Sequence, residues 1–219
     1  AHAREKMFYD FEENDDLSAL GMKFETDKSP LYHCYTRIYE SYFRKIKNKP
    51  IKFLEIGIFQ GGSVRMWEDY FPNADLHFID ITFDYMRLQP TRASIHICDQ
   101  SKKEELETLI EKIGGEFDVI IDDGGHYMDQ QIISFETLFP HLKSGGLYVI
   151  EDLHTSYWPK YNGNRKARGN KNAMGYLKNL LNDVNYVGSS IGTPNRSNPY
   201  IRPPELTNFQ RDILSMTFY

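Results

Sequence analysis

Short apolar runs recur along the middle of the chain, and a more polar segment separates each run from the next. The runs are Lys52 to Ile58, Leu76 to Ile81, Ile95 to Cys98, Phe117 to Asp122 and Leu147 to Ile150. Short runs rich in β-branched and aromatic residues are typical of strands that are buried on both faces. Because helical segments lie between them, the pattern predicts a parallel sheet with right-handed crossovers.

The segments beside these runs have the spacing of amphipathic helices. We expect helices over Pro30 to about Asn48, Ser63 to about Tyr70, Lys102 to about Ile113, Asp129 to Leu142 and Ala173 to about Asn182. The first begins at Ser29-Pro30 and carries an aromatic stripe that we interpret as core packing. Ser101 is expected to cap the third helix, with Glu104 completing a capping box. The closing stretch, Ile213 to Tyr219, has the pattern of a further strand.

These elements predict an α/β fold with a Rossmann-like, doubly wound and mostly parallel sheet. The 219 residues suit a single domain. Long loops inside a compact domain are commonly lids or binding loops, and Leu153 to Asn172 and Gly188 to Leu206 are two such stretches. Because the chain would then end within a strand, a truncated or excised domain stays open as an interpretation.

Composition narrows the classes of partner. The net charge of -5 leaves no basic surface for nucleic acid. Cys34 and Cys98 are too few for a disulfide framework and fit a reducing compartment. No apolar run approaches the roughly 18 residues of a membrane span, and the start lacks a signal-peptide pattern. We therefore expect a soluble, cytoplasmic protein without nucleic-acid or membrane partners. A homo-oligomer and a parent multidomain assembly both stay open.

Two of the expected strands end in adjacent acids. One run ends in Asp122-Asp123 and continues into Gly124-Gly125-His126, and the other ends in Glu151-Asp152. If the two strands are neighbours, their ends lie roughly 5 Å apart. Carboxylates at such distances repel one another unless a cation or protons neutralise them. The pattern therefore predicts a site for a hard divalent cation. Asp122 faces the opposite way from Asp123, so we expect it to accept backbone N–H bonds near a bound cofactor instead.

The end of the first strand has the composition of a ligand-binding turn. Gly57 follows the strand, Gly61-Gly62 allow close approach of the backbone, and Ser63 opens a helix. Asp80 ends the second strand about 20 residues further on, where an acid can bind a ribose diol. Asp99 ends the third strand near the expected position of an adenine, and Glu55 can orient the turn. Because the spacing is not G-x-G-x-x-G and the helix start carries no Lys or Arg except Arg65, a nucleoside without phosphates fits better than a dinucleotide.

These motifs together resemble those of class I S-adenosylmethionine-dependent methyltransferases. The resemblance is greatest to the metal-dependent sugar O-methyltransferases of macrolide and related natural-product pathways, which are similar to the cephalosporin hydroxylase group. The stretches that carry it, within about residues 18 to 160, are Glu55-x-Gly57 with Gly61-Gly62-Ser63, Asp99-Gln100, Thr26-Asp27-Lys28, His33-x-Tyr35-Thr36-x-x-Tyr39, Asp122-Asp123-Gly124-Gly125-His126, and Phe139 through Trp158. We accordingly expect an N-terminal helical cap over residues 1–49, a cofactor-binding core over 50–152, and a lid, helix and last strand over 153–219.

The resemblance implies roles for individual residues. Asp123, Glu151 and Asp152 would hold Mg²⁺, which prefers oxygen ligands, and His126 would be the general base. The donor would be S-adenosylmethionine, and the acceptor a hydroxyl of a sugar or glycosylated natural product. Gln100 would belong to the cofactor site.

Flanking residues complete the expected pocket. Lys28 and Tyr35 are expected near the methionine end of the cofactor, with Lys28 as the partner of a carboxylate, although helix capping and packing would also account for them. His154, Tyr157 and Trp158 follow the second acid pair and are candidates for contact with the acceptor. Two other functions stay open: a catechol-type metal-dependent O-methyltransferase, and a non-catalytic cofactor-binding module of a larger assembly.

Overall fold

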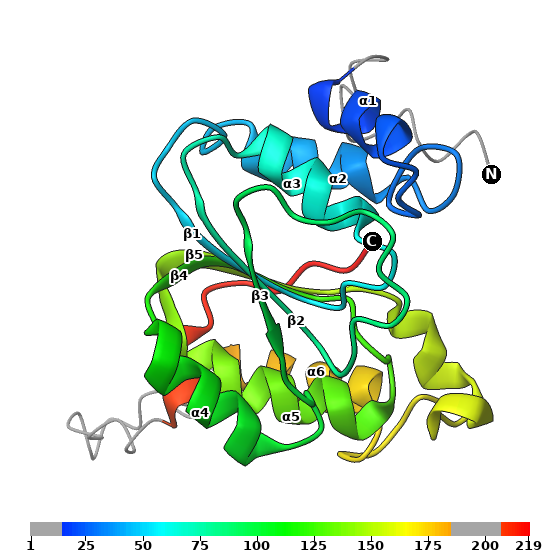
Figure 1. Ribbon diagram of the computed structural model, residues 1–219. Helices are drawn as coiled ribbons and strands as arrows, with labels where there is room; N and C mark the ends of the chain where they lie inside the picture. Colours follow the sequence, from blue (N-terminus) through cyan, green and yellow to red (C-terminus); the bar gives the residue numbers. More distant parts are fainter. Residues whose placement is uncertain (1–14, 185–206) are drawn as a thin grey trace, which may run out of the picture.

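A five-stranded, all-parallel sheet forms the centre of the protein (Figure 1). The computed structural model describes residues 15–184 and 207–219. The strands are β1 (Lys52–Ile56), β2 (Asp75–Asp80), β3 (Ser94–Ile97), β4 (Phe117–Asp122) and β5 (Leu142–Ile150), in the spatial order β3-β2-β1-β4-β5. The order reverses beside β1, which is the arrangement of doubly wound sheets. The predicted fold class is confirmed.

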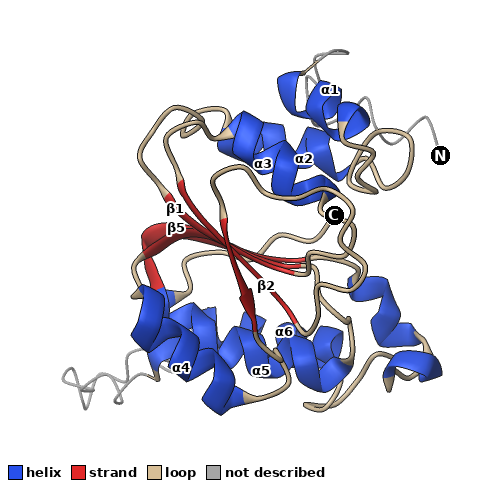
Figure 2. Ribbon diagram, viewed as in Figure 1, coloured by secondary structure: helices blue, strands red, loops and turns tan. Residues whose placement is uncertain are grey.

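Helices cover both faces of the sheet (Figure 2). One face carries α1 (Asp16–Lys23), α2 (Tyr35–Phe43) and α3 (Gly62–Tyr70), and the other carries α4 (Lys103–Ile113), α5 (Met128–Leu138) and α6 (Ala173–Val184). Short helical turns follow at η1 (Phe139–His141), η2 (Leu153–Tyr157), η3 (Pro159–Tyr161) and α8 (Asn208–Asp212). In the described parts of the chain, none of these helices has the length and apolar character needed to cross a membrane.

The two layers of the core follow the alternation of side chains along the strands. Phe53 and Ile121 pack with Trp67 beneath α1 to α3, whereas Leu54 and Ile120 pack toward α4 and α5. All five side chains are fully buried. Burial on both faces explains why the central strands read as continuous apolar runs.

The helix predicted to start at Ser29-Pro30 instead begins at Tyr35. Residues 26–34 form successive turns, in which the backbone N–H groups of Tyr32 and Cys34 both donate to the carbonyl of Ser29. These turns leave Leu31 72% exposed, so this residue is not part of the expected apolar stripe. They also direct Lys28 into the protein interior. The aromatic stripe on α2 is therefore shorter than predicted. The sequence pattern also did not predict α1.

The predicted capping box of α4 is wrong. Lys102 is the N-cap residue and makes no side-chain cap bond. The Ser101 hydroxyl donates to Asp99 Oδ1 at 2.6 Å, and Glu105 Oε2 accepts from the Asp99 backbone at 2.8 Å. The carboxylates of Asp99 and Glu105 thus accept these hydrogen bonds in place of the expected cap, and the bonds fix the loop after β3.

The predicted strand over Ile213 to Tyr219 is also wrong. Within the described residues this stretch pairs with no strand, and Ile213 and Met216 pack against the apolar side chains of α5 and α6. Its last hydroxyl, on Tyr219, lies 2.5 Å from that of Tyr42 in α2. A segment with a strand-like sequence forms a strand only where it can pair with a free sheet edge. Here the packing of its side chains against the helices decides its conformation instead. The Gly188–Leu206 loop lies outside the described residues.

The loop between β2 and β3 is fastened to α3 by one carboxylate. Glu68 accepts backbone N–H bonds from Thr91, Arg92 and Ala93 at 2.7 to 3.0 Å, and its side chain is 2% exposed. Burial alone would raise the pKa of Glu68, but these N–H bonds outweigh it and lower the pKa. The loop that follows Asp80 is therefore held by charge-assisted bonds.

Candidate active site

The two acid pairs meet at one edge of the sheet, because β4 and β5 are neighbouring parallel strands. Asp122 is paired with Ile150, and the Glu151 backbone N–H donates to the Asp122 carbonyl at 2.9 Å. The Asp123 N–H donates to the Ile56 carbonyl at 2.9 Å, so β1 ends at the same place. The prediction that these strand ends converge is confirmed.

Two groups of side chains at this edge have the spacing of metal ligands. Asp123, His126 and Asp152 form one group, and Glu55, Asp123 and Glu151 form the other. Within each group, the candidate ligand atoms lie within 4.8 Å of one another. Asp123 belongs to both groups and therefore joins a partly open site to a buried one. These acids supply the hard oxygen donors that Mg²⁺ prefers.

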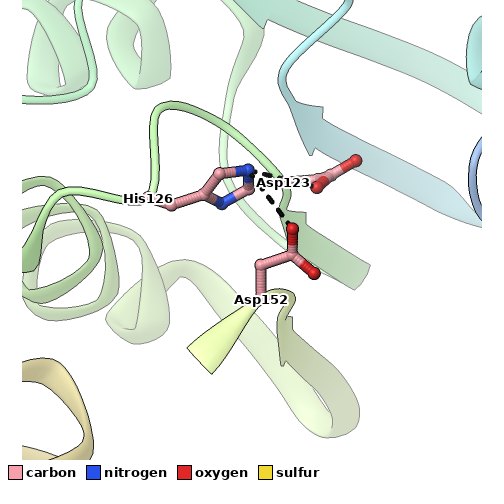
Figure 3. Close-up of side chains that lie close together, drawn as sticks. All are labelled: Asp123, His126 and Asp152. Atoms are coloured by element: carbon pink, nitrogen blue, oxygen red, sulfur yellow. Dashed lines mark ion pairs between the residues drawn. The ribbon is translucent and has the colours of Figure 1, made fainter. Parts of the chain in front are cut away.

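The ring of His126 is directed between the carboxylates of Asp123 and Asp152 (Figure 3). Its Nε2 lies 3.9 Å from Asp123 Oδ1 and 3.7 Å from Asp152 Oδ2. The other ring nitrogen, Nδ1, is buried and has no hydrogen-bond partner among the described residues. The Thr155 hydroxyl lies 3.2 Å from the His126 carbonyl. Nε2 is thus the ring nitrogen that faces the two carboxylates.

His126 and Asp152 both have left-handed backbone conformations, with φ of 60° and 53°. For residues other than glycine this conformation is uncommon and costs about 1–3 kcal/mol. Such strain persists where the surrounding structure fixes the backbone, and it concentrates at functional sites. The two conformations are what bring these side chains from separate loops to face each other.

Lys28 lies at the centre of the buried group. Its ammonium forms an ion pair with Asp123 and lies 3.0 Å from Glu151 Oε1 and 3.3 Å from Glu55 Oε1. Burial alone would lower the pKa of Lys28, but the three carboxylates outweigh it and raise the pKa well above its usual value. Its ammonium is therefore directed to protein carboxylates, and its expected contact with a cofactor carboxylate stays a prediction.

Glu55 is fully buried on β1 beside the glycine turn. Burial raises the pKa of Glu55 to about 7, although the ammonium of Lys28 opposes the shift. Burial also raises the pKa values of Asp123 and Glu151, and the mutual repulsion of these two carboxylates adds to the shift at Glu151. The buried group thus brings three carboxyl groups to a single ammonium, so protons or a further cation are needed to neutralise them all.

Two tyrosines of α2 reach the acids from the other side. Tyr35 donates to Asp152 Oδ1 at 2.7 Å, and Tyr39 donates to Glu151 Oε1 at 2.5 Å. Burial raises the pKa of both phenols, and the nearby carboxylates raise it further. Both tyrosines therefore remain protonated donors.

Asp122 belongs to a separate, fully buried network. Its carboxylate accepts from Gln100 Nε2 at 3.0 Å and from the Ser134 hydroxyl at 2.7 Å. The side-chain amide oxygen of Gln100, Oε1, in turn accepts from the Gly125 N–H at 2.9 Å. The network links the end of β3 to the loop that carries His126. Asp122 lies in neither of the two ligand-spaced groups.

The glycine turn abuts the acidic site. Gly57 has φ of +99°, and a Cβ placed there would lie 2.0 Å from the Asp123 carbonyl oxygen. Gly61, with φ of +84°, is the N-cap of α3, and Ser63 lies in its first turn. Asp80 Oδ2 accepts from the N–H groups of Ile58 and Phe59 at 2.8 and 3.2 Å. Asp80 thus holds the turn, and its contact with a ribose stays a prediction.

Aromatic rings line the side of the site next to His126. Trp158 is 49% exposed, and its ring lies 4.7 Å from His154 and 6.1 Å from Tyr161, between ring centroids. The Tyr161 ring lies 6.4 Å from His126 and 5.5 Å from Tyr127. Tyr157, on the same segment, is 40% exposed. These rings form a continuous aromatic surface that reaches the imidazole.

Sequence reasoning missed several of these contributors. Tyr39 and Tyr161 were not assigned to the site, and Ser134 was not singled out. The spacing of Tyr35 and Tyr39 held a signal, because residues four apart lie on the same face of a helix. Their hydroxyls accordingly reach the consecutive acids Asp152 and Glu151.

Comparison with known proteins identifies the domain. Residues 54–153 match a methyltransferase domain family. This region runs from within β1 to the end of β5 and includes the glycine turn and the acids of the site. Residues 54–153 therefore match a methyltransferase domain, and the parallel sheet of this region has the class I methyltransferase fold, as the motifs predicted.

Similar proteins with known activities methylate sugars. The chain is 35% identical over 194 residues to mycinamicin VI 2''-O-methyltransferase of Micromonospora griseorubida, a match that covers 85% of this chain and 48% of the relative. It is 39% identical over 181 residues to 8-demethyl-8-(2-methoxy-alpha-L-rhamnosyl)-tetracenomycin-C 3'-O-methyltransferase of Streptomyces olivaceus, covering 78% and 45%. The chain thus spans about half the length of these relatives.

Solved structures of a methyltransferase share this fold. MycE, from the mycinamycin biosynthetic pathway, in complex with Mg and SAH has a TM-score of 0.80 at 32% identity, covering 94% of this chain and 52% of that one. The MycE complex that also contains mycinamycin VI has a TM-score of 0.72 at 35% identity, covering 78% and 49%.

Proposed function

We propose that this protein is an S-adenosylmethionine- and Mg²⁺-dependent O-methyltransferase that acts on a sugar hydroxyl of a glycosylated natural product. The observation that carries the proposal is the convergence of Asp123, Glu151, Asp152 and His126 beside the glycine turn. The similarity to sugar O-methyltransferases supports the same reaction and acceptor class.

Asp123, Glu151 and Asp152 would hold the Mg²⁺ ion. Their donor set consists of carboxylate oxygens, which fit this ion, and it would leave positions for water or an acceptor. Bound Mg²⁺ would supply Lewis acidity, which makes a neighbouring hydroxyl easier to deprotonate. The glycine turn that would bind the methyl donor lies directly against the Asp123 carbonyl, because a glycine at position 57 lets the two backbone segments approach closely.

His126 would act as the general base at Nε2. The acceptor oxygen forms a bond to the methyl carbon while the bond from that carbon to the sulfonium sulfur breaks. The hydroxyl proton passes to Nε2, and S-adenosylhomocysteine is the leaving group. The carboxylates of Asp123 and Asp152, 3.9 and 3.7 Å from Nε2, would stabilise the resulting imidazolium.

The aromatic surface of Trp158, Tyr161 and Tyr127 would bind the acceptor. A sugar presents an apolar face of C–H groups, which packs well against aromatic rings. The surface is partly exposed and leads to His126, so a ring bound on it can present a hydroxyl to Nε2. Sugar conjugates are therefore favoured over catechols, whose phenols ionise at a pKa of about 10 and need less help from a base.

The test is methyl transfer by the purified protein to a panel of deoxysugar conjugates and catechols, with Mg²⁺ or with EDTA. We expect transfer to a conjugate that stops in EDTA and returns when Mg²⁺ is restored. Transfer that continues in EDTA would remove the metal from the reaction. Transfer confined to catechols would make catechols the acceptor class instead of sugar conjugates. Cofactor binding without any turnover would favour a non-catalytic module.

A further inference from the structure

The three acids at the strand ends are each held by a side chain from one N-terminal segment. Lys28 contacts Asp123, Tyr35 donates to Asp152, and Tyr39 donates to Glu151. All three donors lie within residues 28–39, before the first strand, whereas their acceptors follow β4 and β5. The segment thus supplies a donor to each of the three acids, and Lys28 also lies 3.0 Å from Glu151 Oε1 and 3.3 Å from Glu55 Oε1.

On Asp123 and Asp152, the donor contacts only one of the two carboxylate oxygens. On Asp123, Lys28 contacts Oδ2, while Oδ1 is the atom nearest to His126 Nε2. On Asp152, Tyr35 bonds to Oδ1, while Oδ2 is the atom nearest to Nε2. In both cases one oxygen is fixed by the N-terminal segment and the other faces the side of the site that holds His126 (Figure 3).

We propose that Lys28, Tyr35 and Tyr39 are positioning residues. Each holds one carboxylate oxygen of Asp123, Asp152 or Glu151, so that the other oxygen of the same carboxylate can bind the metal. This inference rests on the proposed function, because it concerns the same Mg²⁺ ion. It assigns residues 28–39 to the metal centre and not only to a cap over the cofactor.

The burial of these donors supports a positioning role. Lys28 is 1% exposed, and Tyr39 is 4% exposed, so neither can exchange its carboxylate for water at little cost. A carboxylate on a free side chain samples several rotamers, and a bond to one of its oxygens removes that freedom. Groups that orient metal ligands in this way typically change metal affinity by about 10- to 100-fold when they are removed.

Tyr35→Phe is the most direct test, because it removes one hydroxyl and retains the ring. We expect the Mg²⁺ dissociation constant, measured by calorimetry on protein saturated with S-adenosylhomocysteine, to rise roughly 10-fold. The dissociation constant of S-adenosylhomocysteine itself should change less than about twofold. Turnover should recover at saturating Mg²⁺, because the variant weakens binding of the ion and leaves His126 intact.

Tyr42→Phe is the matched control, since Tyr42 lies on the same helix and its hydroxyl contacts Tyr219 instead of an acid. Its Mg²⁺ affinity should equal that of the unaltered protein. If Tyr35→Phe binds Mg²⁺ as tightly as Tyr42→Phe does, the positioning role is refuted. If the unaltered protein binds no Mg²⁺ at all, the proposed function fails instead.

Lys28→Met separates positioning from simple charge. Removing a cation that sits beside Asp123 and Glu151 should tighten Mg²⁺ binding if Lys28 only competes with the ion, because the site becomes more negative. Positioning predicts weaker binding. Tighter binding by Lys28→Met would therefore overturn the proposal for Lys28. If this variant does not fold, Tyr39→Phe tests positioning at Glu151 without a change of charge: at least a several-fold loss of Mg²⁺ affinity is expected, and unchanged affinity would refute the proposal there.

Discussion

The carboxylates of Asp122 and Asp123 belong to separate networks, although the two residues are consecutive. Asp122 is bound by Gln100 and Ser134 in the interior, whereas Asp123 contacts Lys28 and faces His126. One network fixes the loop that carries the imidazole, and the other forms the candidate metal site. The end of β4 therefore supplies both the support of the loop that carries His126 and one acid of the candidate metal site.

His126→Asn should reduce turnover by about 10²- to 10⁴-fold, because it removes the proposed general base. Asparagine is the better replacement than alanine, since it tolerates the left-handed backbone conformation at this position. Binding of S-adenosylhomocysteine, measured by calorimetry, should remain within about twofold. A variant that retains full turnover at saturating Mg²⁺ would exclude His126 as the base.

Gly57→Ala should disrupt the cofactor turn. Its new Cβ would lie 2.0 Å from the Asp123 carbonyl oxygen, so the turn and the end of β4 must move apart. We expect a loss of more than about 2 kcal/mol in the free energy of unfolding and at least tenfold weaker binding of S-adenosylhomocysteine.

Gly145→Ala is the matched control for this substitution. Gly145 also has a positive φ, of +81°, but a Cβ there meets no atom within 4 Å. It should therefore lose only the roughly 1–2 kcal/mol of left-handed strain and keep cofactor affinity. Equal effects of the two substitutions in chemical denaturation and calorimetry would show that the contact with Asp123 is unimportant.

Glu68→Gln should make the protein less stable at neutral pH by about 2 kcal/mol, because an amide cannot replace a carboxylate that accepts several N–H bonds. The pKa of Glu68 is lowered in the folded state, so its contribution is present above the ordinary pKa and is lost as the pH falls through the folded value. Unfolding measured between pH 7 and about pH 3 should show less loss in Glu68→Gln than in the unaltered protein. Glu107→Gln, at an exposed pair with Lys103, should behave like the unaltered protein.

Trp158→Ala should raise the Michaelis constant for the acceptor by about 10-fold or more, since loss of a stacking ring costs on the order of 1–3 kcal/mol. The Michaelis constant for S-adenosylmethionine should not change. Trp158→Phe should restore most of the acceptor affinity, because it retains an aromatic face. Steady-state kinetics with a sugar conjugate will decide. A Michaelis constant for the acceptor that is unchanged in both Trp158→Ala and Trp158→Phe would remove Trp158 from the acceptor site.

The central strands could be predicted because their positions are decided by burial. Phe117 to Asp122 was predicted with its observed bounds, since every second residue faces one of two apolar layers and the run ends where the acids begin. The convergence of Asp123 with Glu151 followed from the same reasoning. Both depend on local sequence and on the general topology of parallel sheets.

The N-terminal segment could not be predicted in the same way. The sequence after Pro30 has helical spacing, yet the turns around Ser29 prevail because they bring Lys28 to three carboxylates that lie far along the chain. Which oxygen of Asp152 faces Tyr35 depends on rotamers and on a left-handed backbone, and neither leaves a periodic signal. The pairing of Tyr219 with Tyr42 is likewise decided by tertiary packing.

The contact between Gly57 and the Asp123 carbonyl has a consequence for how such enzymes can diversify. In the proposed enzyme, the donor pocket and the cation pocket would share a wall of backbone, so their spacing would be set without any contribution from Leu153 to Asn172. Substitutions in that segment could then exchange one sugar or aglycone for another while the distance travelled by the methyl group stays constant. A single scaffold would thereby be free to decorate many different molecules.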